Sequence, residues 1–441
     1  MATTISGSAT TEAALERTTM ARVTRRLLPM LMLCYFVAYL DRVNIGFAGL
    51  TMNRDLGFSA AVFGFGGGIF FLGYFIFEVP SNVILEKVGA RTWIARILVT
   101  WGVISGLTAL VVGPYSFFTI RFLLGLAEAG FFPGMILYLT WWFPSFYRSR
   151  ITAVFMAAIP ISNILGSVVS GAIPNLHGWL NLAGWQWLFI LEAAPAVVLG
   201  VLFYLYMTDR PEHAQWLEPG QRRWLIERLA AERAQREAIR HYSLGEALRD
   251  RRVLLLSLVY FGGTYAGYGI VLFQPQIVRK LAEGYGTIGL INAIPYVFGV
   301  IAMILWGRHS DHTGERAGHT AIGYAVGATG LIACGLMTDP VMTMAMLAMG
   351  QPSTGPCFWS LPTAMLSGTA AAGRIALINA LGNLGGFFGP SIFGLVRDAT
   401  GNFTMGLIAI ALGPVMSAIL VLLLGHDRRL EQIPTRQVAT P

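Results

Sequence analysis

Charged residues are scarce in this 441-residue sequence. Asp, Glu, Lys and Arg together make up 12% of it, about half of their usual share in soluble globular proteins. Hydrophobic residues make up 55%, and they fall in runs long enough to cross a lipid bilayer. The scarcity of charge therefore excludes an ordinary soluble domain and predicts an integral membrane protein with many spans.

The sequence also lacks the side-chain patterns that metal sites and most enzymes need. Its 3 cysteines, Cys34, Cys334 and Cys357, lie in apolar segments without metal-type spacing, which disfavours a disulfide scaffold and a zinc site. The 7 histidines are scattered, and there is no nucleotide-binding loop or nucleophile elbow. We therefore expect no metal, no cofactor and no enzymatic activity.

Twelve apolar windows of about 20 residues can be distinguished along the chain. The first 26 residues are polar and lack the apolar core of a cleavable signal peptide. The windows predict an all-α polytopic membrane protein, with 12 transmembrane helices in two six-helix bundles. The expected spans lie near residues 27–50, 62–84, 92–113, 115–142, 150–173, 186–207, 253–273, 287–306, 318–337, 341–364, 374–396 and 402–425.

These windows divide the chain into five parts. They are an N-terminal tail (1–26), a first six-helix bundle (27–207), a linker (208–252), a second six-helix bundle (253–425) and a C-terminal tail (426–441). The linker contains "RRWLIERLAAERAQREAIRHY", which is charged and has helical spacing. We interpret it as a solvated linker helix.

Lys and Arg are distributed unevenly between the two sides that the spans define. If both termini are cytoplasmic, 24 of the 31 Lys and Arg residues fall on the cytoplasmic side and 4 on the outer side. This asymmetry follows the positive-inside rule and predicts cytoplasmic termini in a cell inner membrane. It also accounts for the net charge of +8 without a nucleic-acid partner.

Two short loops at equivalent places in the halves resemble each other. The chain reads "NVILEKVGAR" after the second span and "GRHSDHTGER" after the eighth. A tight turn needs glycine, and the acid and base suit contacts with neighbouring helix ends. The repeat predicts two related halves with a site between them, the architecture of a secondary transporter. The matched residues of this loop motif are Glu86 with Asp311, Gly89 with Gly314, and Arg91 with Arg316.

Twelve spans with this loop resemble the major facilitator superfamily, whose loop motif reads G-x-x-x-D-R-x-G-R-R. The second copy fits at Gly307, Asp311, Gly314 and Arg316, whereas the first has Asn82 for the opening glycine and Glu86 for the aspartate. Four segments further resemble its anion:cation symporter family, from about residue 26 to residue 425. They are "YLDRVNIGFA", "RFLLGLAEAGFFPG", "GWQWLFILEAAP" and "FWSLPTAMLSGTAAAGRIALINALGNLGGFFGP".

The resemblance implies a substrate class. Carriers of tartrate, phthalate, hydroxyphenylacetate, hexonates and nicotinate belong to this family, and its bacterial members mostly take up organic anions together with protons. The stretches "SDHTGER" and "LPTAMLSGTAAAGRIALIN" most resemble the tartrate-type carriers. An aromatic carboxylate fits the same pattern, so the identity of the anion stays open.

Six charged residues lie deep inside the predicted spans, away from their ends, and all six belong to the first half. Charges at membrane depth are costly unless they are paired or face water, so they mark functional sites. Spans 7 to 12 contain no acidic residue, which leaves neutral polar and aromatic groups to the second half. We therefore expect proton handling in the first half. The six are Asp41, Arg42, Glu78, Arg121, Glu128 and Glu192.

Helical spacing relates four of these charges. Arg121 and Glu128 are two turns apart and point the same way, whereas the neighbours Asp41 and Arg42 point about 100° apart. In the family that the chain resembles, the acids matching Asp41 and Glu128 carry the coupling proton. The arginines matching Arg42 and Arg121 serve the anion or pair with those acids, because guanidinium can grip a carboxylate with two hydrogen bonds.

The same charges also have a structural explanation, because buried ion pairs can simply join helices. For Glu192, which has no basic residue nearby in sequence, this explanation is favoured. Glu78 is left open between a substrate contact and a further titrating site. Neutral candidates for substrate contact come from both halves: Tyr39, Tyr74, Trp359, Thr363, Asn379 and Asn383.

The sequence thus predicts a proton-coupled symporter that imports a small organic anion by alternating access, and that functions as a monomer in the lipid bilayer. An exporter or exchanger of the same fold is the nearest alternative. The fifth span, "AVFMAAIPISNILGSVVSGAI", does not match the Gly/Pro-rich motif of proton-driven exporters. A sensor would need a signalling domain, for which the predicted tails leave little room, and a membrane enzyme would need motifs that we do not find.

Overall fold

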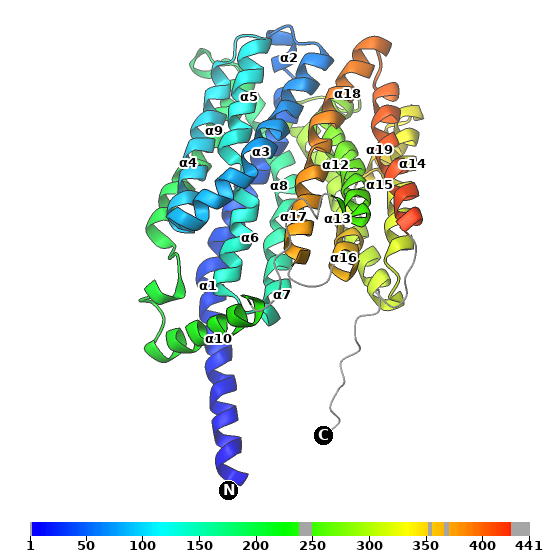
Figure 1. Cartoon of the computed structure of the whole chain (residues 1–441). Coiled ribbons are helices and arrows are strands. Elements are labelled where there is room, and N and C mark those ends of the chain that lie inside the picture. The colour runs from blue at the N-terminus through cyan, green and yellow to red at the C-terminus, as the bar shows by residue number, and fades with distance from the viewer. Residues whose placement is uncertain (1, 238–248, 352–354, 366–369, 425–441) are drawn as a thin grey trace.

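The computed structural model describes residues 2–237, 249–351, 355–365 and 370–424, and within these ranges every regular element is a helix (Figure 1). Eleven helical segments are long and apolar enough to cross a membrane. The first half contains α1 (Ala2–Ala48), α2 (Met52–Asp55), α3 (Ala60–Val88), α4 (Ala90–Leu107), α5 (Pro114–Glu128), α6 (Phe131–Trp142), α7 (Ser145–Met156), α8 (Ala158–Ala172) and α9 (Gly184–Tyr206). The second half contains α12 (Arg251–Val278), α13 (Tyr285–Thr313), α14 (Ala317–Leu336), α15 (Pro340–Met349), α16 (Gly355–Met365), α17 (Ala370–Asn383), α18 (Gly385–Thr400) and α19 (Phe403–Leu424).

The structure differs from the expected spans at two places. The residues assigned to an N-terminal tail are helical and continue the helix of the first span, because α1 begins at Ala2. The tenth expected span, near 341–364, consists of the shorter helices α15 and α16. Residues 352–354, between these two helices, lie outside the described residues. Apolar content therefore located the segments, but it did not locate the ends of their helices.

Three of the membrane-length segments are broken helices. The best-defined break separates α5 from α6 at Gly130, whose φ of 84° lies in the left-handed region that favours glycine. Glu128 is the last residue of α5 and so lies directly before this break. Milder interruptions separate α7 from α8 at Ala157 and α17 from α18 at Leu384, where the backbone angles stay in the right-handed helical region. Interrupted helices at membrane depth are tolerated where protein covers the freed backbone groups.

The linker helix α10 (Pro219–Glu237) packs on α1 and α6, at the end of the bundle where α1 begins (Figure 1). We call this the linker end. Arg22 of α1 donates hydrogen bonds to the side chains of Glu218 and Gln221, both at 2.9 Å. Glu232 accepts the backbone N–H of Ser145 at the start of α7. These contacts attach the described part of the linker to the first half.

The two halves meet closely at the end of the bundle opposite the linker end. There α3 packs along α18, and α8 packs against α13. The backbone N–H groups of Ala60 and Ala61 donate to Asp398 at 2.9 and 2.8 Å. Arg279 donates to the carbonyl of Leu50 at 2.5 Å. Polar contacts thus close the opposite end.

Buried hydrophobic residues confirm that the halves join at the opposite end. One cluster there contains side chains of both halves, such as Phe63, Phe273 and Phe393, whose rings lie against one another. Two other clusters have their buried residues in one half each: the first is centred on Trp101 and Trp142, and the other lies around Phe358 toward the linker end. Within the described residues, therefore, the core that holds the halves together is concentrated away from the linker end.

Close contact between α3 and α5 depends on Gly125. A Cβ atom at this position would lie 2.0 Å from the backbone carbonyl oxygen of Phe70. We expect Gly125→Ala to lower stability by about 1–3 kcal/mol, because neither backbone can move without disturbing the other helix. Gly327→Ala in α14 is the matched control, since a Cβ there meets no atom within 4 Å. Melting temperatures in detergent test this, and equal values for the two variants would contradict it.

Candidate functional site

A small cavity lies between the two halves and contains two of the predicted arginines. Its volume is about 20 Å³. Arg42 of α1 and Arg121 of α5 supply its charged lining, and Tyr268 of α12 supplies a hydroxyl from the second half. The other lining residues are Ile45, Gly67, Phe70, Phe71, Val271, Leu272 and Pro390. We call this space the arginine cavity. It has room for about one water molecule, so the halves must part further before an organic anion can occupy it.

Arg42 forms an ion pair with Glu128, the acid at the end of α5. Its Nη2 donates to Oε1 of Glu128, which is fully buried. The guanidinium also lies over the rings of Tyr39 and Tyr74, with its central carbon 4.9 and 5.8 Å from their centroids. Aromatic faces stabilise a cation where water is absent. The ion pair leaves Nε of Arg42 and Oε2 of Glu128 without hydrogen-bond partners.

Arg121 lies beside this pair. It is 4% exposed, and its guanidinium carbon is 5.1 Å from the ring centroid of Phe70, which Arg42 also approaches, at 5.7 Å. Arg121 is within electrostatic range of Asp41, Glu128 and Arg42. No ion pair joins it to another described residue, and its Nε has no hydrogen-bond partner. Two arginines therefore face one cavity, and one of them has hydrogen-bonding capacity to spare.

Asp41 points into the first half, away from the arginine cavity. Its Oδ1 accepts hydrogen bonds from Asn44, at 3.1 Å, and from the hydroxyl of Ser105, and its Oδ2 accepts from Trp101 Nε1 at 3.2 Å. The residue is 3% exposed. The angular separation expected for neighbours on a helix thus sends Asp41 into the bundle and Arg42 into the cavity.

The two remaining acids lie in different surroundings. Glu78 of α3 is 7% exposed, has an oxygen without a hydrogen-bond partner, and is within electrostatic range of Tyr74 and of Tyr260 on α12. It therefore faces the space between the halves. Glu192 of α9 lies inside the first half, where its Oε1 accepts from Ser170 at 2.7 Å. The structure brings Asp41, Arg42, Arg121 and Glu128 together, and it leaves Glu78 outside that group.

The neutral residues predicted to contact substrate are only partly gathered at the cavity. Tyr39 and Tyr74 stand beside Arg42. Asn379 and Asn383 lie half-buried on α17, which packs on α12 and touches α3, and neither forms a hydrogen bond with the described part of the chain. Trp359 packs edge-on against Tyr260, in the cluster around Phe358. The side chain of Thr363 lies outside the described residues.

Sequence analysis missed several residues that shape the site. Trp101 and Ser105, which hold Asp41, are four residues apart on α4 and therefore share one face of that helix. A search for polar residues at this spacing in every span could have found them. Phe70, which lies between the two guanidinium groups, carries no signal that distinguishes it from other core aromatics.

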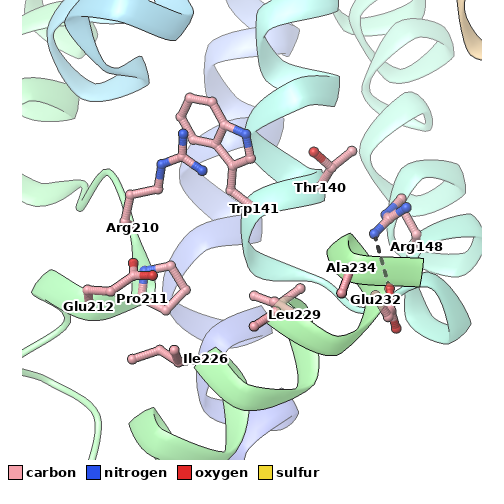
Figure 2. Close-up of a pocket in the computed structure, with 11 residues that line it drawn as sticks. Thr140, Trp141, Arg148, Arg210, Pro211, Glu212, Ile226, Leu229, Glu232 and Ala234 are labelled. Atoms are coloured by element: carbon pink, nitrogen blue, oxygen red, sulfur yellow. Dashed lines mark ion pairs between the residues drawn. The ribbon is translucent and has the colours of Figure 1, made fainter. Parts of the chain in front are cut away.

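A larger hollow, of about 330 Å³, lies at the linker end (Figure 2). Figure 2 shows Arg210 over the ring of Trp141, and the guanidinium carbon is 3.5 Å from the ring centroid. Arg148 pairs with Glu232 of α10 at 3.7 Å on the other side of the hollow. None of the six intramembrane charges lines this space. It reflects how the linker helix is attached, and the arginine cavity remains the candidate site. Among the described residues, no group of three or more His, Cys, Asp or Glu could hold a metal ion.

The loop motif joins helix ends in both halves. In the second copy, Gly314 ends α13 with a φ of 70°, and Arg316 pairs with Asp311 at 2.6 Å. In the first copy, the backbone N–H of Arg91 donates to Asp209 at 2.7 Å, and its side chain donates to the carbonyl of Tyr204 at the end of α9. Gly89 has a φ of 95°, and Glu86 is exposed. Both copies therefore have a glycine with a positive φ, and they differ in what the arginine binds.

Comparison with known proteins finds a family model and several named transporters that match this chain. Residues 31–390 match the family model described as Major Facilitator Superfamily. A protein of Agrobacterium vitis, provisionally named a tartrate transporter, is 52% identical over 415 residues, which cover 93% of this chain and 96% of that protein. A protein of Acinetobacter baumannii named a quinolone resistance transporter is 40% identical, over 97% of this chain and 99% of that protein. The solved structure of a bacterial homologue of the human lysosomal transporter Spinster superposes with a TM-score of 0.76 over 92% of this chain and 97% of that chain; at 16% identity this supports the fold alone.

Glu315, in the loop of the second copy, caps the start of α14. Its carboxylate accepts the backbone N–H groups of Gly318 and His319 and contacts the His319 ring, at 2.6 Å. Burial raises the pKa of Glu315, but these hydrogen bonds outweigh it and hold the pKa below its ordinary value. A carboxyl with a lowered pKa stabilises the folded state above its unfolded pKa, and this contribution is lost as the pH falls through the folded value.

We therefore expect Glu315→Ala to cost about 1 kcal/mol at neutral pH, as for other lost helix caps. The deficit should shrink below about pH 4, near the ordinary pKa of Glu. Thermal unfolding in detergent at several pH values measures it. Glu86→Ala is the matched control, because Glu86 is exposed in the equivalent loop. A deficit for Glu315→Ala that is independent of pH would show that the carboxylate charge is not what caps the helix.

Proposed function

The chain belongs to the Major Facilitator Superfamily, and from this premise we propose that it is a proton-coupled symporter that imports a small organic anion. One observation carries the proposal: Arg42 and Arg121 face one cavity between the halves, next to two buried acids. Both arginines keep their charge under all physiological conditions, so the cavity attracts an anion. Transport runs by alternating access between the two halves.

Charge balance supports coupling to protons. Asp41 and Glu128 together offset Arg42 and Arg121, so the four-residue group is neutral when all are ionised. A bound carboxylate adds a negative charge in surroundings of low dielectric, where an unbalanced charge is costly. A proton on Glu128 or Asp41 removes that excess. Substrate and proton therefore favour each other's binding, as symport requires.

The ion pair gives this coupling a local mechanism. Glu128 occupies the donors of Arg42 that face it. A proton on Glu128 weakens the pair and frees those donors for the substrate carboxylate, which can accept two hydrogen bonds from one guanidinium. The spare donors of Arg121 would hold the same or a second carboxylate. When the proton leaves, Glu128 competes again for Arg42 and helps to release the anion.

The closed end of the bundle suggests which state the structure represents. The contacts of Asp398 and Arg279 seal the end opposite the linker. With cytoplasmic termini in the inner membrane, as the distribution of Lys and Arg favours, that end is the outer one. The structure then corresponds to a state closed to the outside. Rocking of the halves would break these contacts and open the cavity outward.

The substrate we favour is a hydroxy acid with one or two carboxylates, such as tartrate. The relative from Agrobacterium vitis carries a tartrate transporter's name and matches nearly the whole chain. Tyrosine hydroxyls of Tyr39, Tyr74 and Tyr268 near the arginines suit substrate hydroxyls. Export is the second candidate, because the relative from Acinetobacter baumannii is named for quinolone resistance.

Uptake into proteoliposomes tests the proposal. Labelled tartrate, succinate, benzoate and hydroxyphenylacetate would be offered with and without an inward proton gradient. Accumulation of one acid that depends on the gradient supports symport and names the substrate. If no acid accumulates, and a preloaded quinolone leaves the vesicles instead, export replaces import as the function.

Asp41→Asn should abolish gradient-driven accumulation, because the amide cannot bind and release a proton. Counterflow, in which labelled outside substrate exchanges for unlabelled inside substrate, should persist because it needs no net proton movement. The readout is the ratio of the two rates in the same vesicles. Asp55→Asn, a change in the exposed pair of Arg54 and Asp55, is the control. Full accumulation by Asp41→Asn would remove Asp41 from the coupling mechanism.

Arg121→Lys should reduce substrate affinity about tenfold or more, because an ammonium group cannot form the planar pair of hydrogen bonds that guanidinium offers a carboxylate. Substrate binding to purified protein, followed by calorimetry, measures this directly. Arg96→Lys in α4 is the control, since Arg96 stacks on Trp93 away from the cavity. Unchanged affinity in Arg121→Lys would exclude contact between Arg121 and the anion.

A further inference from the structure

Glu192 is a buried acid that the proposed coupling mechanism does not use. It lies on α9 and is 2% exposed. No ion pair joins it to any residue in the described ranges, although a buried carboxylate normally requires a cation or several hydrogen-bond donors. Its Oε1 accepts one hydrogen bond, from Ser170 of α8, and its Oε2 accepts none.

Asn44 lies near both Asp41 and Glu192. Its side-chain N–H donates to Asp41 Oδ1 at 3.1 Å, and Asn44 is also a near neighbour of the Glu192 carboxyl. The amide oxygen of Asn44 and Oε2 of Glu192 are both buried without a hydrogen-bond partner. The two acids therefore share one neighbouring amide, whose hydrogen bond goes to Asp41.

The number of hydrogen-bond donors differs between the two acids. Asp41 accepts hydrogen bonds from Asn44, Ser105 and Trp101, as suits an ionised carboxylate. Glu192 receives only the hydroxyl of Ser170. Two negative charges within electrostatic range of each other in an apolar interior are unfavourable. A proton on Glu192 removes one of these charges and lets the unpartnered Oε2 stay buried without a cation.

We propose that Glu192 is a proton-binding site of the transport cycle, which in this conformation holds a proton on Oε2 while Asp41 is ionised. Acids that interact this closely titrate as a pair, so a change of charge on Asp41 changes proton binding by Glu192 as well. The proton on Glu192 is therefore exchanged during the cycle, in addition to the one that Asp41 binds.

The charged groups around this network are few. On α1 the neighbour is Asp41, and on α5 Arg121 and Glu128 lie within range of Asp41. The helices α4 and α8 contribute Trp101, Ser105 and Ser170 but no titratable group in this region. Arg121 balances Asp41 but forms no contact with Glu192 in the described structure. A proton is thus the available partner for the second acid.

Infrared spectroscopy of the purified full-length protein locates the proton without any transport assay. A protonated carboxylic acid has a carbonyl stretching band that a carboxylate lacks. We expect such a band at neutral pH in the wild type, its loss in Glu192→Gln, and its return in Glu192→Asp. Ser170→Ala keeps every acid but removes a hydrogen bond to Glu192, so it should shift the band. If both Glu192→Gln and Ser170→Ala leave the spectrum unchanged, Glu192 is ionised and the proposal is wrong.

A second experiment measures transport and rests on the proposed symport. Its readout is the ratio of the anion concentrations inside and outside the vesicles at equilibrium, the accumulation ratio. Loss of one transported proton lowers this ratio about tenfold for each pH unit of gradient. We expect that loss in Glu192→Gln, with counterflow kept, because the glutamine amide oxygen can still accept the hydrogen bond from Ser170. A merely structural role would change rates but leave the ratio at the wild-type value, and that outcome overturns the proposal.

Two controls separate the proposal from its premise. Leu191→Ala changes an exposed neighbour of Glu192 on α9 and should match the wild type in both the infrared and the transport experiment. If the wild type itself does not accumulate an anion with a proton gradient, the symport function fails, whereas the infrared bands still decide whether Glu192 binds a proton.

Discussion

The ion pair between Arg42 and Glu128 is the contact on which the architecture of the site depends. Neither group could stay charged in an apolar bundle by itself, and neither can leave without exposing the other. The pair joins α1 to α5. α5 also packs against α3, where Gly125 lets it touch the α3 backbone at Phe70. The break at Gly130 ends α5 directly after Glu128, so the acid stands at a helix end that faces its partner.

The chemistry of the site is concentrated in the first half, and the second half closes it. Every intramembrane charge discussed here comes from α1, α3, α5 or α9. The second half presents Tyr260 and Tyr268 to the arginines and to Glu78, and its asparagines on α17 remain unbonded within the described residues. Such a division suits a rocking motion. The charged first half can keep its internal hydrogen bonds and ion pair while the neutral second half moves toward it or away from it. The outer contacts of Asp398 and Arg279 are polar and few, and can therefore be broken and remade.

The sequence predicted the class and the charges well because both depend on simple energetic rules. Long apolar runs can be recognised without a structure, and an arginine or acid inside one is conspicuous. The seven-residue spacing of Arg121 and Glu128 correctly placed them on one face, with both near Asp41 and Arg42. Spacing does not, however, identify the neighbouring helix. The packing of three separate helices decides which acid pairs with Arg42. It also decides that Trp101 and Ser105 donate hydrogen bonds to Asp41. The ends of the helices could not be predicted from the sequence either, as the helical residues before the first span show.

Helix geometry separates Arg42, which we propose binds the anion, from Asp41, which we propose binds a proton. Asp41 and Arg42 are adjacent, but they point into different surroundings: a sealed network of hydrogen bonds and a cavity that must open. Water and substrate can reach Arg42 when the halves part, while Asp41 remains enclosed by Trp101, Ser105 and Asn44. The charge of Asp41 nevertheless affects the cavity electrostatically, because Arg121 lies within electrostatic range of Asp41 and of Glu128. A proton bound inside the first half can thus change the attraction of the cavity for an anion without touching the anion. In the proposed symport, a proton on Asp41 then acts on the anion through its charge alone, whereas a proton on Glu128 acts through the ion pair with Arg42.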